Sequence, residues 1–247
     1  MASPDIIDET HNRLLTDMGP VYYETDTERL GSIVVEPFNA YSSLAMALVA
    51  VLIWTLLLSK DSGRSPFLAF IFAPLLFVGG VGSTLFHAFR SSQFFLLLDW
   101  LPILLLTLLL SLHYWYKVFP NRTFIVVMIL LILVARALPS VFMRGAAAIN
   151  LSYFLSGVLI LIPLFIFLFK TRFTNGKYIL ASCLVLLMAL TFRLADDYEQ
   201  LALPMGTHWL WHIFSAWGAW LLAVYISKSA GIRREVPSGS KNVSVES

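Results

Sequence analysis

Long apolar stretches alternate with short polar ones along most of this chain. Seven of the apolar stretches have roughly 17–25 residues, the length that a helix needs to cross the hydrocarbon core of a bilayer. Short polar turn sequences separate them, of which Thr174-Asn175-Gly176 is an example. The pattern predicts an all-α fold with seven transmembrane helices near residues 37–58, 67–88, 94–115, 123–140, 147–169, 178–195 and 207–227.

Polar sequence flanks the predicted spans at both ends of the chain. Residues 1–32 are rich in aspartate and glutamate, whereas residues 229–247 are polar and contain proline, glycine and serine. A segment of the second kind cannot bury enough apolar surface to fold, so we expect a disordered tail. The expected organisation is an acidic N-terminal segment over 1–32, one seven-helix transmembrane domain over 33–228 and the tail over 229–247.

The basic residues divide unevenly between the two sides of this predicted bundle. Of the 17 Lys and Arg residues, 11 fall on the side that holds the C-terminus and 6 on the side that holds the N-terminus. Loops that carry more Lys and Arg stay in the cytosol, according to the positive-inside rule. The N-terminus is therefore expected outside, in a lumen or periplasm, and the C-terminus in the cytosol.

Composition agrees with a membrane protein and excludes other classes. The chain is 58% hydrophobic and 13% charged, with a mean hydropathy of +0.78, whereas soluble domains carry about 25% charged residues. A net charge of +2 gives no indication of nucleic-acid binding, and the single Cys183 excludes an intramolecular disulfide and a four-sulfur metal site. No signal peptide is expected, which fits an endoplasmic reticulum or Golgi membrane in a eukaryote or the inner membrane of a bacterium.

Histidines are the most informative polar residues within the predicted spans. His208 and His212 are four residues apart at the start of the last span, so both rings project from one face of a helix. The topology places His87, near the end of the second span, at the same membrane depth. Three histidines suit a zinc ion that keeps its fourth position for water, as catalytic sites do. We therefore predict a zinc site at these three residues and interpret His11 and His113 as interfacial.

Two further polar residues are expected beside the histidines. Ser83 lies four residues before His87 on the same helix face, and Asp99 lies in the first turns of the third span. A carboxylate in a membrane span needs a partner or a metal, so Asp99 is expected to act as a general base on the attacking water or to hold that water in line. Ser83 would donate a hydrogen bond to the water or to an oxyanion; the alternative is a bond back to the Gly79 carbonyl.

The remaining polar and small residues at this depth have more than one interpretation. Glu36 and Asn39 either support the metal site from behind, lie beside a calcium ion, or cap the first helix and pack against the seventh. The glycines before Ser83 leave room for a close helix approach or for a substrate chain; they are Gly79, Gly80 and Gly82. A local ion pair at the end of the sixth span is interpreted as structural; its members are Arg193, Asp196 and Asp197.

The ordered set of these motifs resembles that of the alkaline ceramidase family. The set comprises Glu36-Pro-Phe-Asn39-Ala-Tyr-Ser42, Gly82-Ser83-Thr-Leu-Phe-His87, Leu98-Asp99 and His208-Trp-Leu-Trp-His212, and the resemblance extends from about residue 19 to 228. That family belongs to a superfamily of seven-helix membrane hydrolases that includes the adiponectin/progestin receptors and GPI-anchor-remodelling proteins. The resemblance implies zinc on the three histidines, Ser83 and Asp99 around the water, and hydrolysis of ceramide to a sphingoid base and a fatty acid.

The N-terminal segment departs from the pattern of that family. Relatives with a calcium site carry an Asp-Trp-Cys-Glu-type motif ahead of the glutamate that corresponds to Glu36, where this chain reads Val21-Tyr-Tyr-Glu-Thr-Asp26. Glu24, Asp26 and Glu28 still offer the oxygen ligands that calcium prefers, so a calcium ion stays open and unassigned. Two alternatives to ceramide hydrolysis also stay open: an ester or phospholipid substrate for the same site, and a non-enzymatic receptor or transporter with a structural zinc.

Overall fold

The computed structural model describes residues 17–30, 33–58, 65–196 and 203–230, and over these ranges the regular secondary structure is helical. A single turn, η1 (Thr27–Arg29), precedes seven long helices. These are α2 (Pro37–Leu58), α3 (Ala73–Phe89), α4 (Gln93–Val118), α5 (Arg122–Phe142), α6 (Gly145–Lys170), α7 (Gly176–Ala195) and α8 (His208–Lys228). The all-α prediction and the seven predicted spans are confirmed to within a few residues at each end. Residues 1–16 of the acidic segment and 231–247 of the expected tail lie outside the described ranges.

The second span begins with a wide turn that the hydrophobic pattern did not predict. In this turn, η2 (Leu68–Phe72), the amide of Ala73 donates to the carbonyl of Leu68, five residues earlier. Pro74 follows at the start of α3 and has no amide hydrogen. In a regular helix its ring would clash with the carbonyl four residues earlier, and the wider turn relieves that contact.

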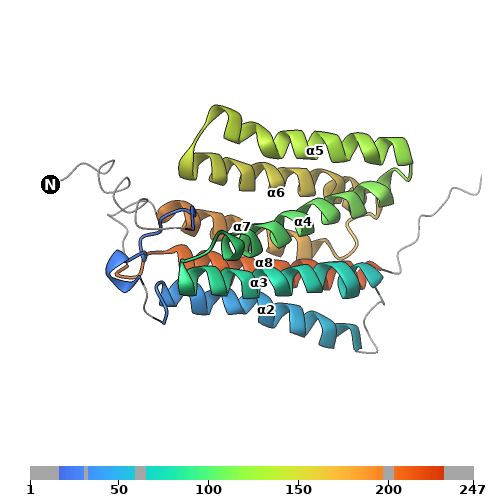
Figure 1. Cartoon of the computed structure of the whole chain (residues 1–247). Coiled ribbons are helices and arrows are strands. Elements are labelled where there is room, and N and C mark those ends of the chain that lie inside the picture. Colours follow the sequence, from blue (N-terminus) through green and yellow to red (C-terminus); the bar gives the residue numbers. More distant parts are fainter. Residues whose placement is uncertain (1–16, 31–32, 59–64, 197–202, 231–247) are drawn as a thin grey trace, which may run out of the picture.

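The helices run antiparallel in chain order and lie side by side in one bundle (Figure 1). Helix α2 packs against α3 and α8, α7 packs against α8, and α4 lies between α3 and α6. Helix α5 packs mainly on α6, at the edge of the bundle. The core draws buried side chains from six of the seven helices, among them Ile53, Phe72, Leu110, Leu164, Ile179 and Tyr225. Because the helices alternate in direction, α3, α5 and α7 end where α2, α4, α6 and α8 begin; we call this the proximal end.

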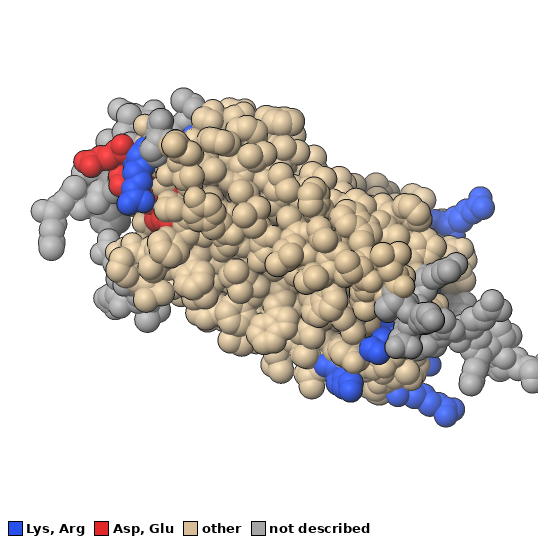
Figure 2. All heavy atoms as spheres, turned by 90° about the horizontal axis from the view of Figure 1, so that it is seen from below, with Lys and Arg blue, Asp and Glu red and all other residues tan. Residues whose placement is uncertain are grey.

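The surface has the character that a bilayer requires. Each of the seven helices is long and apolar enough to cross a membrane. On the face shown in Figure 2, uncharged side chains cover a broad central band, and Lys, Arg, Asp and Glu gather at the two ends. The acidic side chains in that view lie at one end, whereas the other end shows only Lys and Arg. These features indicate a multi-pass membrane protein.

Candidate metal centre

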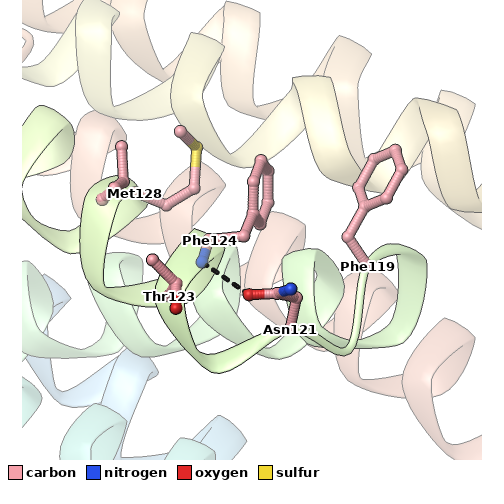
Figure 3. A pocket seen from close by; sticks show the side chains of 6 residues that line it. Phe119, Asn121, Thr123, Phe124 and Met128 are labelled. Carbon is pink, nitrogen blue, oxygen red and sulfur yellow. Dashed lines mark hydrogen bonds between the residues drawn. The ribbon is translucent and has the colours of Figure 1, made fainter.

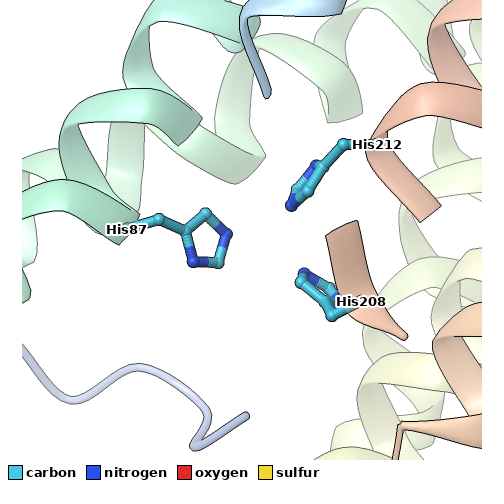
Figure 4. Close-up of side chains that lie close together, drawn as sticks. All are labelled: His87, His208 and His212. Atoms are coloured by element: carbon cyan, nitrogen blue, oxygen red, sulfur yellow. The ribbon is translucent and has the colours of Figure 1, made fainter. Parts of the chain in front are cut away.

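Three buried histidines from two helices meet near the proximal end of the bundle. His87 lies in the last turn of α3, and His208 and His212 lie in the first turns of α8. Their rings face one another across the α3–α8 junction (Figure 4), and one ring nitrogen from each lies within 4.8 Å of the others. The exposed fractions of the three residues are only 0, 2 and 3%. The structure thus places together the three side chains that the sequence predicted as metal ligands.

Unpaired ring nitrogens show that this group suits a metal ion. Within the described part of the chain, His87 Nε2, His208 Nδ1 and both nitrogens of His212 are buried without a hydrogen-bond partner. Leaving a polar atom buried and unpaired costs about 1–3 kcal/mol, so such atoms rarely converge without a ligand. Imidazole nitrogens are ligands for zinc and for other divalent transition metals. The geometry and the donor type therefore fit a bound metal ion.

Glu36 fixes the orientation of the first histidine. Its Oε2 atom lies 2.5 Å from His87 Nδ1, which leaves Nε2 of the same ring to face the other histidines. A carboxylate behind a ligating histidine sets the tautomer and raises the basicity of the ligand. Asn39 Nδ2 donates to the same carboxylate at 3.2 Å. Glu36 and Asn39 thus lie behind the metal centre, on the α2 side.

The cap of α2 comes from Glu24 and not from Glu36. The Glu24 carboxylate accepts hydrogen bonds from the amides of Phe38 at 2.7 Å and Asn39 at 2.9 Å. A negative charge at this position also favours the positive end of the helix dipole. Each oxygen of Glu24 accepts one of these amides, and Asp26 pairs with Arg29 at the surface. Among the described residues the one grouping suited to a metal is the histidine cluster, so the structure assigns no calcium to the acidic segment.

A buried arginine that sequence reasoning missed joins the N-terminal segment to the metal centre. Arg90 ends α3 in the left-handed conformation, with φ 45°, and is 1% exposed. Its guanidinium donates to Asp17 Oδ2 at 2.7 Å, to the Pro20 carbonyl at 3.0 Å and to Glu36 Oε1. Thr25 also donates to Glu36 Oε1, at 2.6 Å. A charge so far inside a protein needs partners of this kind. In the sequence, the one signal for this role was the position of Arg90 three residues after the predicted ligand His87.

The Glu36 carboxylate stays ionised because of these contacts. Burial raises the pKa of Glu36, but His87, Arg90 and the bond from Thr25 together lower it well below its ordinary value. Burial likewise lowers the pKa of Arg90, but Glu36 and Asp17 raise it above the ordinary range. The result is a charged, hydrogen-bonded cluster directly behind His87.

Ser83 and Asp99 meet beside the histidines, from two different helices. The Asp99 carboxyl group of α4 interacts with the Ser83 hydroxyl of α3. Ser83 Oγ also lies 3.0 Å from Oγ of Ser43, a residue that the sequence did not single out. Ser43 gives its own hydrogen to the Asn39 carbonyl at 2.8 Å, so Ser83 is the donor toward Ser43 or Asp99. In the described part of the chain these contacts replace the alternative bond from Ser83 to the Gly79 carbonyl.

A glycine and a proline allow this meeting of α3 and α4. Pro102 cannot donate to the carbonyl of Leu98 four residues earlier, so that carbonyl is released from the helix ladder. The Leu98 oxygen lies only 2.4 Å from where a Cβ on Gly82 would stand. Gly80 makes a similarly close approach to the backbone of α2 at Ala47. The glycines before Ser83 therefore serve close helix packing.

Replacing Gly82 with alanine is expected to separate α3 from α4 and to move Asp99 away from Ser83. The added methyl group meets backbone atoms that cannot rotate away, and such overpacking costs about 1–3 kcal/mol. Thermal unfolding in detergent measures the loss. The matched control is Gly157→Ala in α6, where no atom lies within 4 Å of the new Cβ. An equal stability for both variants would contradict the close approach.

The predicted ion pair at the end of α7 is wrong for the described residues. Asp196 accepts instead from the backbone amides of Thr207 at 2.6 Å and His208 at 2.9 Å, and so caps α8. Arg193 Nε donates to Asn150 Oδ1 at 2.9 Å. Asp197 lies outside the described ranges. The carboxylate is used for the helix terminus because the first amides of α8 have no partner within the helix.

Tyr22 extends the metal centre toward the N-terminal segment. Its ring stacks on His208 with centroids 3.9 Å apart and an angle of 28° between the planes. Tyr22 also lies over His87, at 5.1 Å between centroids. The chain from Asp17 to Thr25 therefore forms one wall of the histidine cluster and is not a separate appendage.

One concave region of the surface lies far from the histidines. It is a shallow groove of about 460 Å³ at the connection between α4 and α5 (Figure 3), lined by Phe119, Asn121, Thr123, Phe124, Val127 and Met128. The rise of α4 places Phe119 about 30 Å from Asp99. The side chain of Asn121 accepts from the Phe124 amide at 3.0 Å and caps α5.

His113, interpreted as interfacial, stacks on Phe67 with centroids 4.3 Å apart and takes no part in the metal centre.

Comparison of the chain with protein-family models and with curated proteins finds no match. The functional conclusion therefore depends on the geometry of the site and on the motifs in the sequence.

Proposed function

We propose that this protein is a zinc-dependent hydrolase of membrane lipids that cleaves the amide bond of ceramide. The observation that carries the proposal is the buried cluster of His87, His208 and His212 with unpaired ring nitrogens, next to the Ser83–Asp99 pair. When bound, zinc lowers the pKa of a water molecule to about 7 and polarises a carbonyl group. The choice of ceramide comes from the resemblance of the motifs to those of alkaline ceramidases.

The side chains around the cluster have complementary parts in this reaction. Asp99 accepts a proton from the attacking water as the C–O bond forms, and returns it to the amine nitrogen as the C–N bond breaks. When substrate is bound, Ser83 turns its hydrogen from Ser43 or Asp99 to the carbonyl oxygen, on which negative charge develops. Glu36 holds His87 in the tautomer that presents Nε2 to the metal. The proximity of Asp99 and Glu36 to His87 supports these roles.

The position of the cluster supports entry of a lipid from one leaflet. His208 is the first residue of α8, and His87 is two residues from the end of α3, so the site lies near the proximal surface. The positive-inside rule assigns that surface to the lumen or periplasm. A substrate then enters laterally from the outer leaflet, with its acyl chain among α3, α4 and α8. The amide bond of the lipid then lies near the membrane surface, where water for the hydrolysis is available.

Incubation of the purified protein with ceramides and phospholipids tests the proposal. We expect fatty acid release from ceramide, detected by mass spectrometry, and at least about a 10²-fold slower release by Asp99→Ala, the usual scale of an acid or base contribution. Asp26→Ala is the matched control, because Asp26 lies at the surface, where its side chain contacts Arg29 and the Glu28 amide. Equal release by wild type and Asp99→Ala would contradict the mechanism.

The same experiment separates the alternatives. Release of fatty acid from phospholipid alone would assign an ester hydrolase that uses the same residues. A protein that releases no fatty acid, but unfolds when a chelator removes its metal, would be a receptor or transporter with a structural zinc.

A further inference from the structure

The distal end of the bundle, opposite the metal centre, carries basic side chains without acidic ones among the described residues. The Lys and Arg residues described there are Lys117, Arg122, Lys170, Arg172, Lys177 and Lys228. The described Asp and Glu residues lie toward the proximal end, as do the ion pairs that the described residues form. Over the described ranges, the positive charge of the distal end is therefore not balanced by carboxylates, as Figure 2 shows for one face.

Two of these basic residues lie together where α4 and α6 end. Lys117 of α4 places its Nζ atom 5.0 Å from the centre of the Phe167 ring of α6. Lys170 of α6 places its Nζ atom 3.5 Å from the carbonyl oxygen of Val118 of α4. Each ammonium group thus contacts the other helix, so two positive charges share one junction. Like charges at one junction repel, and a bound anion offsets that repulsion.

The groove at the connection between α4 and α5 adjoins this junction (Figure 3). Phe119 lines the groove, and the Lys170 Nζ atom lies 4.8 Å from the centre of its ring. The groove has a polar end at Asn121, just before α5, and an apolar end at Met128, seven residues later. At the rise of an α-helix the apolar end lies about 10 Å deeper along α5. The groove therefore runs from the end of the spans toward the middle of the bilayer, and its volume of about 460 Å³ suits an organic ligand.

An anionic phospholipid presents its groups in the same order. Its phosphate lies at the membrane surface, and its acyl chains extend toward the middle of the bilayer. Basic pockets between transmembrane helices on the cytosolic side bind phosphate head groups of this kind. The positive-inside rule assigns the distal end to the cytosolic leaflet, which is the leaflet that holds the anionic lipids. Charge and polarity thus favour this ligand over an uncharged one.

We propose that the α4–α6 junction and the adjoining groove bind one anionic phospholipid. Lys117 and Lys170 bind its phosphate, and one acyl chain lies in the groove against Phe119, Phe124 and Val127. The site is at the opposite end of the bundle from the three histidines. The inference therefore does not depend on the proposed hydrolysis.

Thermal unfolding of the purified full-length protein in a neutral detergent measures the binding. Dioleoylphosphatidylglycerol is expected to bind about 10-fold or more tightly than dioleoylphosphatidylcholine, which has the same chains but no net charge, since basic side chains at an anionic lipid contribute on this scale. The Lys117→Met/Lys170→Met double variant is expected to lose the preference. The matched control, Lys177→Met/Lys228→Met, removes the same charge from the same end, where both Nζ atoms lie beside Tyr178, at 5.4 and 5.9 Å from its ring centre.

A variant that keeps both lysines tests the groove. Val127 lines the groove and is 44% exposed, so Val127→Trp fills the space assigned to the acyl chain. This variant is expected to bind dioleoylphosphatidylglycerol about 10-fold more weakly than the wild type. Inorganic phosphate has the charge but no acyl chain, and it is expected to leave the unfolding midpoint unchanged at the same concentrations.

Four results would each overturn the inference. The first is equal affinity of the wild type for the two lipids, and the second is a preference that survives in the double lysine variant or is lost equally in its control. The third is full lipid binding by Val127→Trp, or a shift with inorganic phosphate as large as that with lipid, which would indicate a site for ions alone. The fourth is a midpoint that rises with protein concentration and not with lipid, which would assign the groove to a second copy of the chain.

Discussion

Replacing His212 with alanine is expected to remove the bound metal and to slow lipid amide hydrolysis at least about 10²-fold. Loss of a side chain that only supports a ligand already costs about 10–100-fold in metal affinity or activity, and His212 is itself placed as a ligand. Both of its ring nitrogens are buried and unpaired among the described residues, so no other protein contact substitutes for the metal. Elemental analysis of the purified protein gives the metal content, and fatty acid release gives the rate.

The matched control is His113→Ala. His113 lies in α4 toward the distal end and stacks on Phe67, away from the three histidines. This variant should keep the full metal content and the full rate. A His212→Ala protein that still held one metal ion per chain would show that the cluster is not the metal site.

Replacing Arg90 with methionine is expected to lower the free energy of unfolding by about 3–5 kcal/mol, the scale for removing one partner from a buried ion pair. Asp17 and Glu36 would be left as buried carboxylates, with 0% of either side chain exposed. The N-terminal segment would also lose its bond from Arg90 to the Pro20 carbonyl. Thermal unfolding in detergent, with limited proteolysis of the N-terminal segment, measures both consequences.

Arg29→Met provides the comparison for Arg90→Met. Arg29 also pairs with an aspartate, Asp26, at 3.4 Å, but 51 and 43% of the two side chains are exposed. Exposed pairs of this kind contribute about 0–1 kcal/mol, so this variant should unfold close to the wild type. If the two arginine variants unfold at the same temperature, the buried cluster is not what holds the N-terminal segment to the bundle.

The Arg90 cluster also explains how a polar N-terminal segment becomes part of a membrane site. Glu24 caps α2, Tyr22 stacks on His208, and Asp17 pairs with Arg90, so each contact ties the segment to a different helix. A change at Asp17 reaches His87 through Arg90 and Glu36. We therefore expect metal affinity to depend on residues that never touch the metal.

The seven helices followed from the sequence because each span is a run of apolar residues whose length is fixed by the thickness of a bilayer. The ends of the spans followed within a few residues for the same reason. The histidine cluster could be predicted from the sequence because His208 and His212, four residues apart, share a helix face. The alternating directions of the helices bring His87 to the same depth. The wide turn before α3 could not be predicted from the sequence, because a proline such as Pro74 permits a kink, a break or a widened turn.

Only the tertiary structure decided which side chain meets which across the bundle. Local spacing made Arg193 and Asp196 look like partners, yet Asp196 caps α8 and Arg193 turns to Asn150. In the same way Glu36 was a candidate for the cap of the first helix, but packing gave that cap to Glu24. The sequence alone determined the spans and the donors available at one depth, because length and helical periodicity are local properties. The pairing of Arg90, Asp17 and Glu36 depended on contacts over 50 residues apart in the chain, which only the packed helices define.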